Sequence, residues 1–352
     1  LRIWVLELLS LKDKFFTFLL LFISVTLGCG GDLEFNFDDF VESDQKFNII
    51  SYEIQSVADL FNERFRLKSL DKSKLDLKNT LIDKIYDEEL DFFFDIVFPL
   101  PEFSLEESPP KLLLISPRSN IERLDEVLLT ARLTDAEIVS IEQDIESQTD
   151  YSSIIVNIGG IAAYPSIVTE VSDKGAMFKL IAHEWLHQYL FFFPLGRAYF
   201  SDEDMRSVNE TLANIFADNL LNNMCKEDVY IQSGYCLQNT DVSEKDFDYS
   251  VYMKDLRQQV DFFLLAGEIE KSEKLMNSAT IYLNSRGYNI RRINQAWFAF
   301  HGSYADTPAS SSEINNELTN IISSEKSLGN AIRKLRSIDN YQEYLRFVDE
   351  KK

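Results

Sequence analysis

The stretch HEWLHQ (183–188) carries two of the three histidines in a chain of 352 residues. The apolar segments on both sides of it predict one long helix, from about Asp173 to Leu190. Residues four apart share one face of a helix, so His183 and His187 can direct both imidazoles to one point. Because this helix is strongly apolar, we expect the imidazoles to face the interior, where they need a common polar partner.

We expect that partner to be a metal ion. Two imidazoles at this spacing suit Zn²⁺, which lowers the pKa of a bound water to about 7. Glu184 lies about 100° further around the helix and can reach that water to take its proton. The alternative is that the two histidines simply share a solvated helix face. The pattern therefore predicts His183 and His187 as zinc ligands and Glu184 as the general base.

A third protein ligand has to come from elsewhere, because a catalytic zinc normally has three protein ligands and a water. No further histidine follows until His301, so a carboxylate of the next helix is the expected source. That helix is predicted from near Ser201 to about Asn222. Its candidate carboxylates are Asp202, Glu203, Asp204, Glu210 and Asp218.

HEWLH followed by NETLANIFAD (209–218) resembles the gluzincin metallopeptidases, in particular the thermolysin-like pattern of HExxH followed by an NExxxD helix. This resemblance implies that Glu210 is the third zinc ligand. It places Asn214 where the pattern has an aspartate that orients a zinc-bound histidine. Asn214 departs from the pattern, since its amide oxygen can accept from an imidazole N–H but carries no charge.

Two further segments acquire a role through the resemblance. SSIIVNIGGIAAYP (152–165) stands where gluzincins have an edge strand that pairs with the substrate backbone; the alternative is a core strand. In QAWFAFHGSYAD (295–306), His301 and Tyr304 are candidates for the oxyanion donor that the helical lobe commonly supplies. A structural histidine is the alternative for His301. The combination of HEWLHQYL, NET and FHGSYA also resembles an uncharacterised bacterial group of predicted peptidases, over roughly residues 111–310.

The N-terminal sequence predicts export. The uncharged apolar run FFTFLLLFISVTLG (15–28) follows Lys12 and Lys14 and is short for a membrane span, which favours a signal peptide. TLGCGG at its end resembles the lipobox of bacterial lipoproteins, although Thr26 stands in place of the usual leucine. This implies a lipidated Cys29 and an extracytoplasmic, membrane-anchored bacterial lipoprotein. A secreted protein or an uncleaved N-terminal helix is the alternative.

Charge and cysteine content bound the possible partners. With 58 acidic and 35 basic residues the net charge is −23, which argues against nucleic acid as a partner. Apart from Cys29, only Cys225 and Cys236 remain. They form a possible disulfide in an exported protein, with two free thiols as the alternative.

The order of the expected elements predicts an α+β fold. A strand at KLLLISP (111–117), a helix over 133–148 and the strand at 152–165 precede the two helices of the metal site, and later residues read as helices alone. We therefore expect a zincin-like lobe, with a small sheet and the two ligand-bearing helices, followed by an α-helical C-terminal lobe. The expected regions are a signal peptide (1–29), an acidic, mostly helical region (30–110), the catalytic lobe (111–225) and the helical lobe (226–352).

The predicted function is hydrolysis of peptide bonds by a Glu184-activated, zinc-bound water, with a peptide or protein as substrate. Endopeptidase and aminopeptidase activity remain open. The alternative is an exported zinc-binding scaffold or binding lipoprotein with a catalytically silent fold. Arg291 and Arg292 could hold a peptide C-terminus, or could be ordinary helix-surface arginines.

Overall fold

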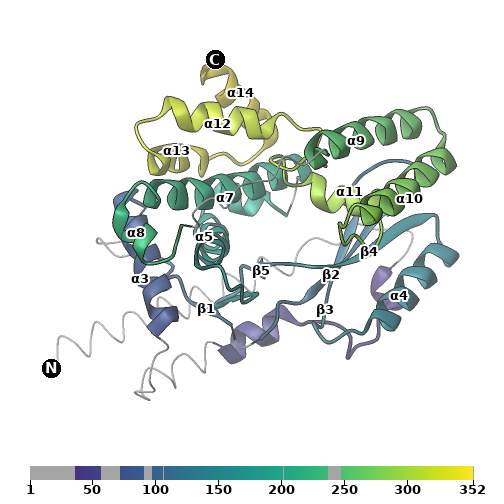
Figure 1. The fold of residues 1–352 in the computed structure, drawn as a ribbon, viewed down its shortest axis with the longest axis horizontal. Helices are drawn as coiled ribbons and strands as arrows, with labels where there is room; N and C mark the ends of the chain where they lie inside the picture. Colours follow the sequence, from purple (N-terminus) through teal and green to yellow (C-terminus); the bar gives the residue numbers. More distant parts are fainter. Residues whose placement is uncertain are drawn as a thin grey trace. The chain divides into compact units, whose positions relative to one another are not determined.

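Two long helices, α5 (Lys174–Leu190) and α7 (Glu203–Met224), pack against each other in the computed structural model (Figure 1). Each helix begins where an aspartate side chain accepts a backbone N–H of the first turn, Asp173 for α5 and Asp202 for α7. These caps satisfy donors that the helix itself leaves unpaired. The sequence predicted both helices, although α7 begins two residues later than expected.

The structure describes residues 36–56, 72–90, 97–105, 107–200, 202–236 and 247–351. Contacts divide the chain into Leu1–Asn36 and Phe37–Lys352, and the description below concerns the second unit. The apolar run at 15–28 and Cys29 lie outside the described residues. Within those residues, no helix is long and apolar enough to cross a membrane.

The described strands form two three-stranded sheets. In the first, β6 (Ser166–Val168) pairs in parallel with β1 (Phe103–Ser104) and antiparallel with β5 (Gly160–Ile161). In the second, β2 (Lys111–Pro117) lies between β3 (Asp125–Leu129) and β4 (Tyr151–Asn157), both antiparallel to it.

The strand predicted over 152–165 is two strands in the structure. β4 ends at Asn157 and β5 begins at Gly160, and the two belong to different sheets. The Gly159-Gly160 pair falls at this transition, where the chain leaves the β3-β2-β4 sheet and approaches α5. The space around Gly159 is narrow, since a Cβ at its position would lie 3.3 Å from the Leu180 side chain of α5.

Helices make up the remaining regular structure and dominate the C-terminal part of the chain. The capping box that Thr134 forms with Glu137 opens α4, at the place expected from the sequence. The chain leaves α10 near Gly287, which has a φ of +89°. The bounds are η1 (Phe37–Phe40), α3 (Lys72–Asp87), α4 (Asp135–Gln148), α6 (Pro194–Ala198), α8 (Asp228–Gln232), α9 (Tyr249–Leu265), α10 (Ile269–Ser285), α11 (Gln295–Gly302), α12 (Ile314–Ser324), α13 (Leu328–Leu335) and α14 (Tyr341–Lys351).

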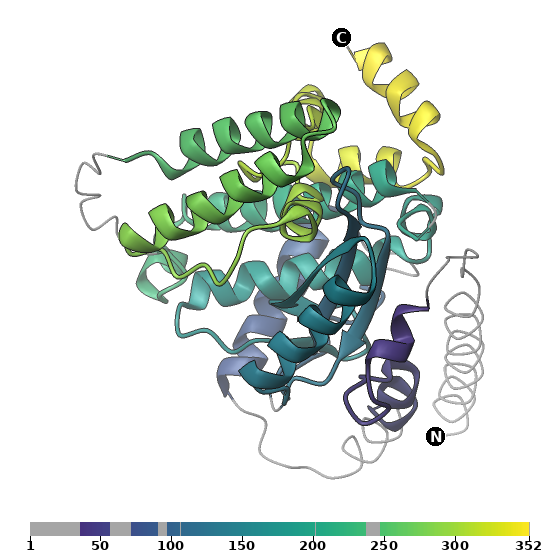
Figure 2. The ribbon, with the colours of Figure 1, turned by 90° about the vertical axis from the view of Figure 1, so that its right-hand side faces the viewer.

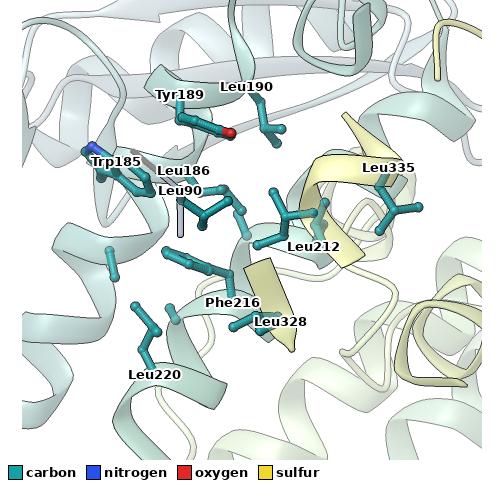
Figure 3. Close-up of a cluster of buried hydrophobic side chains, with 14 of the residues drawn as sticks. Leu90, Trp185, Leu186, Tyr189, Leu190, Leu212, Phe216, Leu220, Leu328 and Leu335 are labelled. Atoms are coloured by element: carbon teal, nitrogen blue, oxygen red, sulfur yellow. The ribbon is translucent and has the colours of Figure 1, made fainter. Parts of the chain in front are cut away.

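The fold is therefore a mixed α+β fold with two small sheets among its described residues and a helical C-terminal region. Its largest hydrophobic cluster joins α5 and α7 to α3 and to the helices α12–α14. Figure 3 shows Trp185 and Tyr189 of α5 close to Phe216 and Leu212 of α7 in this cluster. A second cluster joins β2 and β4 to α9, α10 and α11, which lie together in Figure 2. The apolar packing fixes α5 relative to α7.

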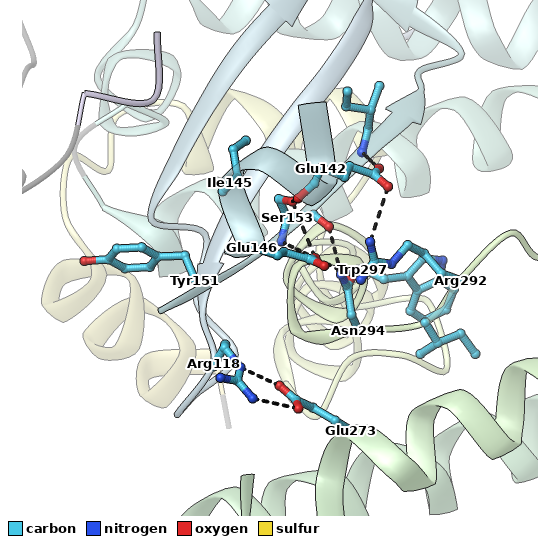
Figure 4. Close-up of polar contacts among 12 residues, drawn as sticks. Arg118, Glu142, Ile145, Glu146, Tyr151, Ser153, Glu273, Arg292, Asn294 and Trp297 are labelled. Carbon is cyan, nitrogen blue, oxygen red and sulfur yellow. Dashed lines mark hydrogen bonds and ion pairs between the residues drawn. The ribbon is translucent and has the colours of Figure 1, made fainter. Parts of the chain in front are cut away.

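The outer edge of β4 is closed by side chains instead of another strand (Figure 4). Glu142, only 2% exposed, accepts the Ile155 backbone N–H at 2.6 Å and both terminal nitrogens of Arg291 at 2.5 and 2.6 Å. Asn294 donates to the Ser153 carbonyl at 2.8 Å. Closing an edge in this way satisfies its backbone groups and blocks pairing with other strands.

This network also engages both arginines of the 291–292 pair. Arg292 reaches Glu142 at 3.3 Å and Glu146 at 2.8 Å. The contacts favour a structural role for the pair over capture of a peptide C-terminus.

We expect Glu142→Gln to lower the free energy of unfolding by about 1.5–3 kcal/mol, because buried hydrogen bonds lose their charged acceptor. Glu273→Gln is the matched control, since its ion pair with Arg118 has both side chains 33% exposed (Figure 4). For the control we expect a loss below about 1 kcal/mol. Urea unfolding measures both. Equal losses would contradict the structural role of Glu142.

Candidate metal centre

The packing of α5 against α7 brings His183, His187 and Glu210 together. The Nε2 atoms of the two histidines are 3.0 Å apart. Oε2 of Glu210 lies 3.4 Å from Nε2 of His183 and 3.3 Å from Nε2 of His187. All three side chains are at least 86% buried, so few water molecules compete for these atoms. The group could hold a metal ion.

The spacing within this group fits a tetrahedral ion. Bonds of about 2.0–2.1 Å, as zinc forms with nitrogen and oxygen, separate tetrahedral ligand atoms by about 3.3–3.4 Å. The observed separations are 3.0–3.4 Å. Oε2 of Glu210 is also buried and has no hydrogen-bond partner. A buried carboxylate oxygen without a donor is costly, and a metal ion would compensate that cost.

Asn209 orients one of the two imidazoles. Its Oδ1 lies 2.7 Å from Nδ1 of His187, and its Nδ2 donates to the Leu195 carbonyl at 3.3 Å. The second bond fixes the amide, so Oδ1 faces the ring and accepts the proton of Nδ1. When the ring is neutral, Nε2 of His187 is then the atom with a free lone pair, which is the state that binds a metal.

Glu210 is held as an anion. Tyr199 donates to its Oε1 at 2.7 Å, which directs Oε2 to the imidazoles. Burial alone would raise the pKa of Glu210, but the neighbouring histidines hold that pKa well below its usual value. Burial opposes protonation of His187, yet Glu210 raises its pKa to about 9 in the metal-free protein. Metal binding must therefore displace a proton from His187.

Glu184 lies beside the triad but is not part of it. Its carboxylate rests against β5 so closely that a Cβ at Gly160 would overlap it. Glu184 is 5% exposed, and burial raises the pKa of its carboxyl. A buried carboxyl with a raised pKa is a candidate proton acceptor and donor. Glycine at position 160 is what lets the strand pass at this distance.

The segment around Tyr304 follows the face of α7 that carries Glu210. Ser207 donates to the Ser303 carbonyl and Thr211 accepts the Ala305 N–H, both at 2.9 Å. Tyr304 lies between these two anchors. Burial and then Glu210 raise its pKa well above the usual value, so its hydroxyl stays protonated and can donate.

His301 lies in different surroundings. Its ring centroid is 4.1 Å from that of Trp297 and 5.1 Å from that of Phe300. Burial lowers its pKa to about 4, and no charged group contributes to that shift. Of the two oxyanion candidates, Tyr304 is therefore the one with electrostatic contact to Glu210 and Glu184.

Asn214, which the resemblance places behind a ligand histidine, has a different partner from that of Asn209. Its amide donates to Asp306, and Asn209, next to Glu210, accepts from His187. The helix geometry explains this, since Asn209 and Asn214 lie more than one turn apart along α7.

Three of the other acidic candidates have contacts outside the metal site. Asp202 caps the helix, Glu203 accepts the Arg123 backbone N–H at 3.3 Å, and Asp218 pairs with Lys179 at 2.7 Å. Among the described residues, Glu210 is the one carboxylate that joins the two histidines in a possible metal site.

Sequence reasoning missed Asn209, Tyr199 and Arg123. Arg123, with a side chain only 5% exposed, pairs with Glu126 and acts electrostatically on Tyr199, Tyr304 and Glu210. Nothing in the local sequence marks Arg123 or Tyr199, because their loops reach the site only through tertiary packing. Asn209 had a signal, its place beside Glu210 in the NET triplet.

A disulfide joins Cys225, at the end of α7, to Cys236, with Cα atoms 5.7 Å apart. It closes the segment that carries Tyr235, whose ring lies 5.8 Å from Phe178 of α5. Gly175 of α5 also meets the Tyr235 backbone so closely that a Cβ there would overlap its carbonyl oxygen. The bridge thus ties the end of α7 to the start of α5.

Comparisons with family models, with curated proteins and with solved structures find no match to this chain.

We expect Asn209→Ala to weaken zinc binding about 10- to 100-fold, because the His187 ring loses the acceptor that fixes its orientation. Asn219→Ala is the control: its amide bonds only the Ile215 carbonyl of the same helix, at 2.8 Å. Competition with a chelator measures the affinities, and melting of the metal-free proteins separates this effect from unfolding. Equal affinities for the two variants would rule out the role of Asn209.

Proposed function

We propose that this chain is a zinc-dependent peptidase of the gluzincin type, with His183, His187 and Glu210 as metal ligands and Glu184 as general base. The observation that carries the proposal is a buried group of two imidazoles and a carboxylate with a second buried carboxyl beside it. Two histidines and one glutamate form a donor set that suits zinc and leaves a position for water and substrate. A purely structural site has no need of the second carboxyl.

In the proposed hydrolysis, the zinc ion and the side chains of the protein have separate roles. When bound, zinc would supply Lewis acidity toward water and toward the substrate carbonyl. Glu184 takes the proton of the attacking water and then delivers it to the leaving amine. The raised pKa of Glu184 suits both roles, since it brings the carboxyl closer to neutral pH. The hydroxyl of Tyr304 can donate a hydrogen bond to the developing oxyanion.

A peptide substrate is supported by β5. This strand is at the edge of its sheet, since the sheet order is β1-β6-β5. An edge strand can take an extended peptide through main-chain hydrogen bonds. Because Gly160 of β5 meets Glu184, a peptide paired there would lie beside the base.

We also propose that the protein acts outside the cytoplasm. The Cys225–Cys236 disulfide supports this, because such bonds persist in oxidising compartments. Lipidation of Cys29, predicted from the sequence, would attach the chain to a membrane.

The test is cleavage of a peptide library by the zinc-loaded protein, analysed by mass spectrometry. We expect Glu184→Gln to keep the bound zinc and to reduce turnover by about 10²–10⁴-fold, the usual contribution of a general base. The amide matches the carboxyl in shape but cannot accept the proton of water.

Glu203→Gln is the control, because Glu203 is an exposed carboxylate in the first turn of α7 and outside the triad. It should keep both zinc and turnover. The proposal is wrong if the wild-type protein binds zinc tightly but cleaves no member of the library, or if Glu184→Gln cleaves as fast as the control.

A further inference from the structure

An Asn–Asp pair lies one helical turn beyond Glu210. Asn214 Nδ2 is 3.1 Å from each carboxylate oxygen of Asp306, a residue 92 positions later in the chain. Asp306 is held in place, because the preceding residue, Ala305, donates its N–H to Thr211 at 2.9 Å. The carboxylate is thus fixed against α7.

The register between α5 and α7 shows which part of the metal site this pair faces. Lys179 bonds Asp218 at 2.7 Å, and eight residues later His187 bonds Asn209 at 2.7 Å. As α5 advances, α7 therefore runs backwards, and the two helices are antiparallel.

His183 is midway between the two anchor points on α5. The midpoint between the matching anchors on α7 falls between residues 213 and 214. Asn214 is therefore level with His183, and it lies on the same helix face as Glu210, four residues before it. Partial loss of hydration raises the pKa of Asp306, whereas the Asn214 hydrogen bond and the charge of His183 act to lower it.

Nδ1 of His183 needs a hydrogen-bond acceptor near Asn214. Its Nε2 faces the other two ligand atoms, so a metal-binding ring carries its proton on Nδ1, on the other side of the imidazole. His187 has Asn209 for this purpose. The Asn214 amide uses its N–H on Asp306, which leaves its carbonyl oxygen as an acceptor for His183.

We propose that Asp306, held by Asn214, is the positioning carboxylate of His183 and strengthens its binding of the metal. The inference rests on the metal site of the proposed function. In the thermolysin-like pattern an aspartate stands at the position of Asn214. Here the charge comes from a distant segment, and Asn214 transmits it. A carboxylate behind a metal-bound imidazole raises the basicity of the ring and fixes its orientation.

The test compares zinc affinities by chelator competition. We expect Asp306→Asn to weaken zinc binding about 10- to 100-fold, the usual effect of losing such a partner. Exchanging the pair, with Asn214→Asp and Asp306→Asn together, should regain most of that loss. The exchange keeps a hydrogen bond with donor and acceptor reversed and returns the carboxylate to a place closer to His183.

Asp255→Asn of α9 is the matched control, because Asp255 is also an exposed aspartate that accepts from a side-chain amide, that of Gln259 at 2.8 Å. Its zinc affinity should stay near that of the wild type. Melting of the metal-free proteins provides the second readout. Asp306→Asn and the control should melt at similar temperatures, because the proposed role acts through the bound metal.

Equal zinc affinities for Asp306→Asn and Asp255→Asn would overturn the inference while leaving the metal site intact. So would a large drop in the melting temperature of metal-free Asp306→Asn that the exchange does not reverse, since Asp306 would then be structural. A wild-type protein that binds no zinc would instead refute the proposed function, and this inference with it.

Discussion

The antiparallel register of α5 against α7 is the constraint on which the rest of the site depends. His183 and His187 reach one point because they share a helix face. Glu210 meets them only if α7 has the right register along the axis of α5. The register is held at one end by His187 and Asn209 and at the other by Lys179 and Asp218. Apolar packing between the two helices then excludes water from the three ligand atoms.

Several contacts hold α5 against the rest of the fold. The indole N–H of Trp185 donates to the Pro99 carbonyl at 2.8 Å, and Gln188 donates to the Ala163 carbonyl and to Ser166. These bonds join α5 to the segments around β1 and β6. They pair N–H groups of an otherwise apolar helix, whereas Oε2 of Glu210 in the metal triad is buried without a hydrogen-bond partner. Such local conflicts with burial are typical of functional sites.

The sequence predicted those parts of the structure that depend on local order. The helix with His183, Glu184 and His187 follows from spacing and apolar flanks, and the helix over 133–148 follows from its apolar periodicity. Glu210 came from the resemblance to a family pattern, because its distance from the histidines depends on packing that no spacing rule supplies. The same resemblance suggested Asn214 as a partner of a histidine; it gave no sign of Asp306, to which the Asn214 amide donates.

Other features could not be predicted, because they arise from contacts between distant segments. Arg123 and Tyr199 reach the site from separate loops. The strand predicted over 152–165 divides between two sheets, because a short apolar run does not reveal which neighbour each half will find. His301 and Tyr304 are only three residues apart, but the anchoring of residues 303 and 305 to α7 decides that Tyr304 contacts the site electrostatically.

X-ray absorption at the zinc edge tests the central claim most directly, with the wild-type protein loaded with one equivalent of zinc. The account predicts two imidazole nitrogens with oxygen as the remaining ligands, at distances of about 2.0–2.2 Å, and no sulfur. It also predicts that Glu210→Ala removes most of the bound zinc. The account would be contradicted if the zinc had a sulfur ligand or only one imidazole ligand. It would also be contradicted if the ligands of the zinc were the same in Glu210→Ala as in the wild type, since the metal would then bind elsewhere.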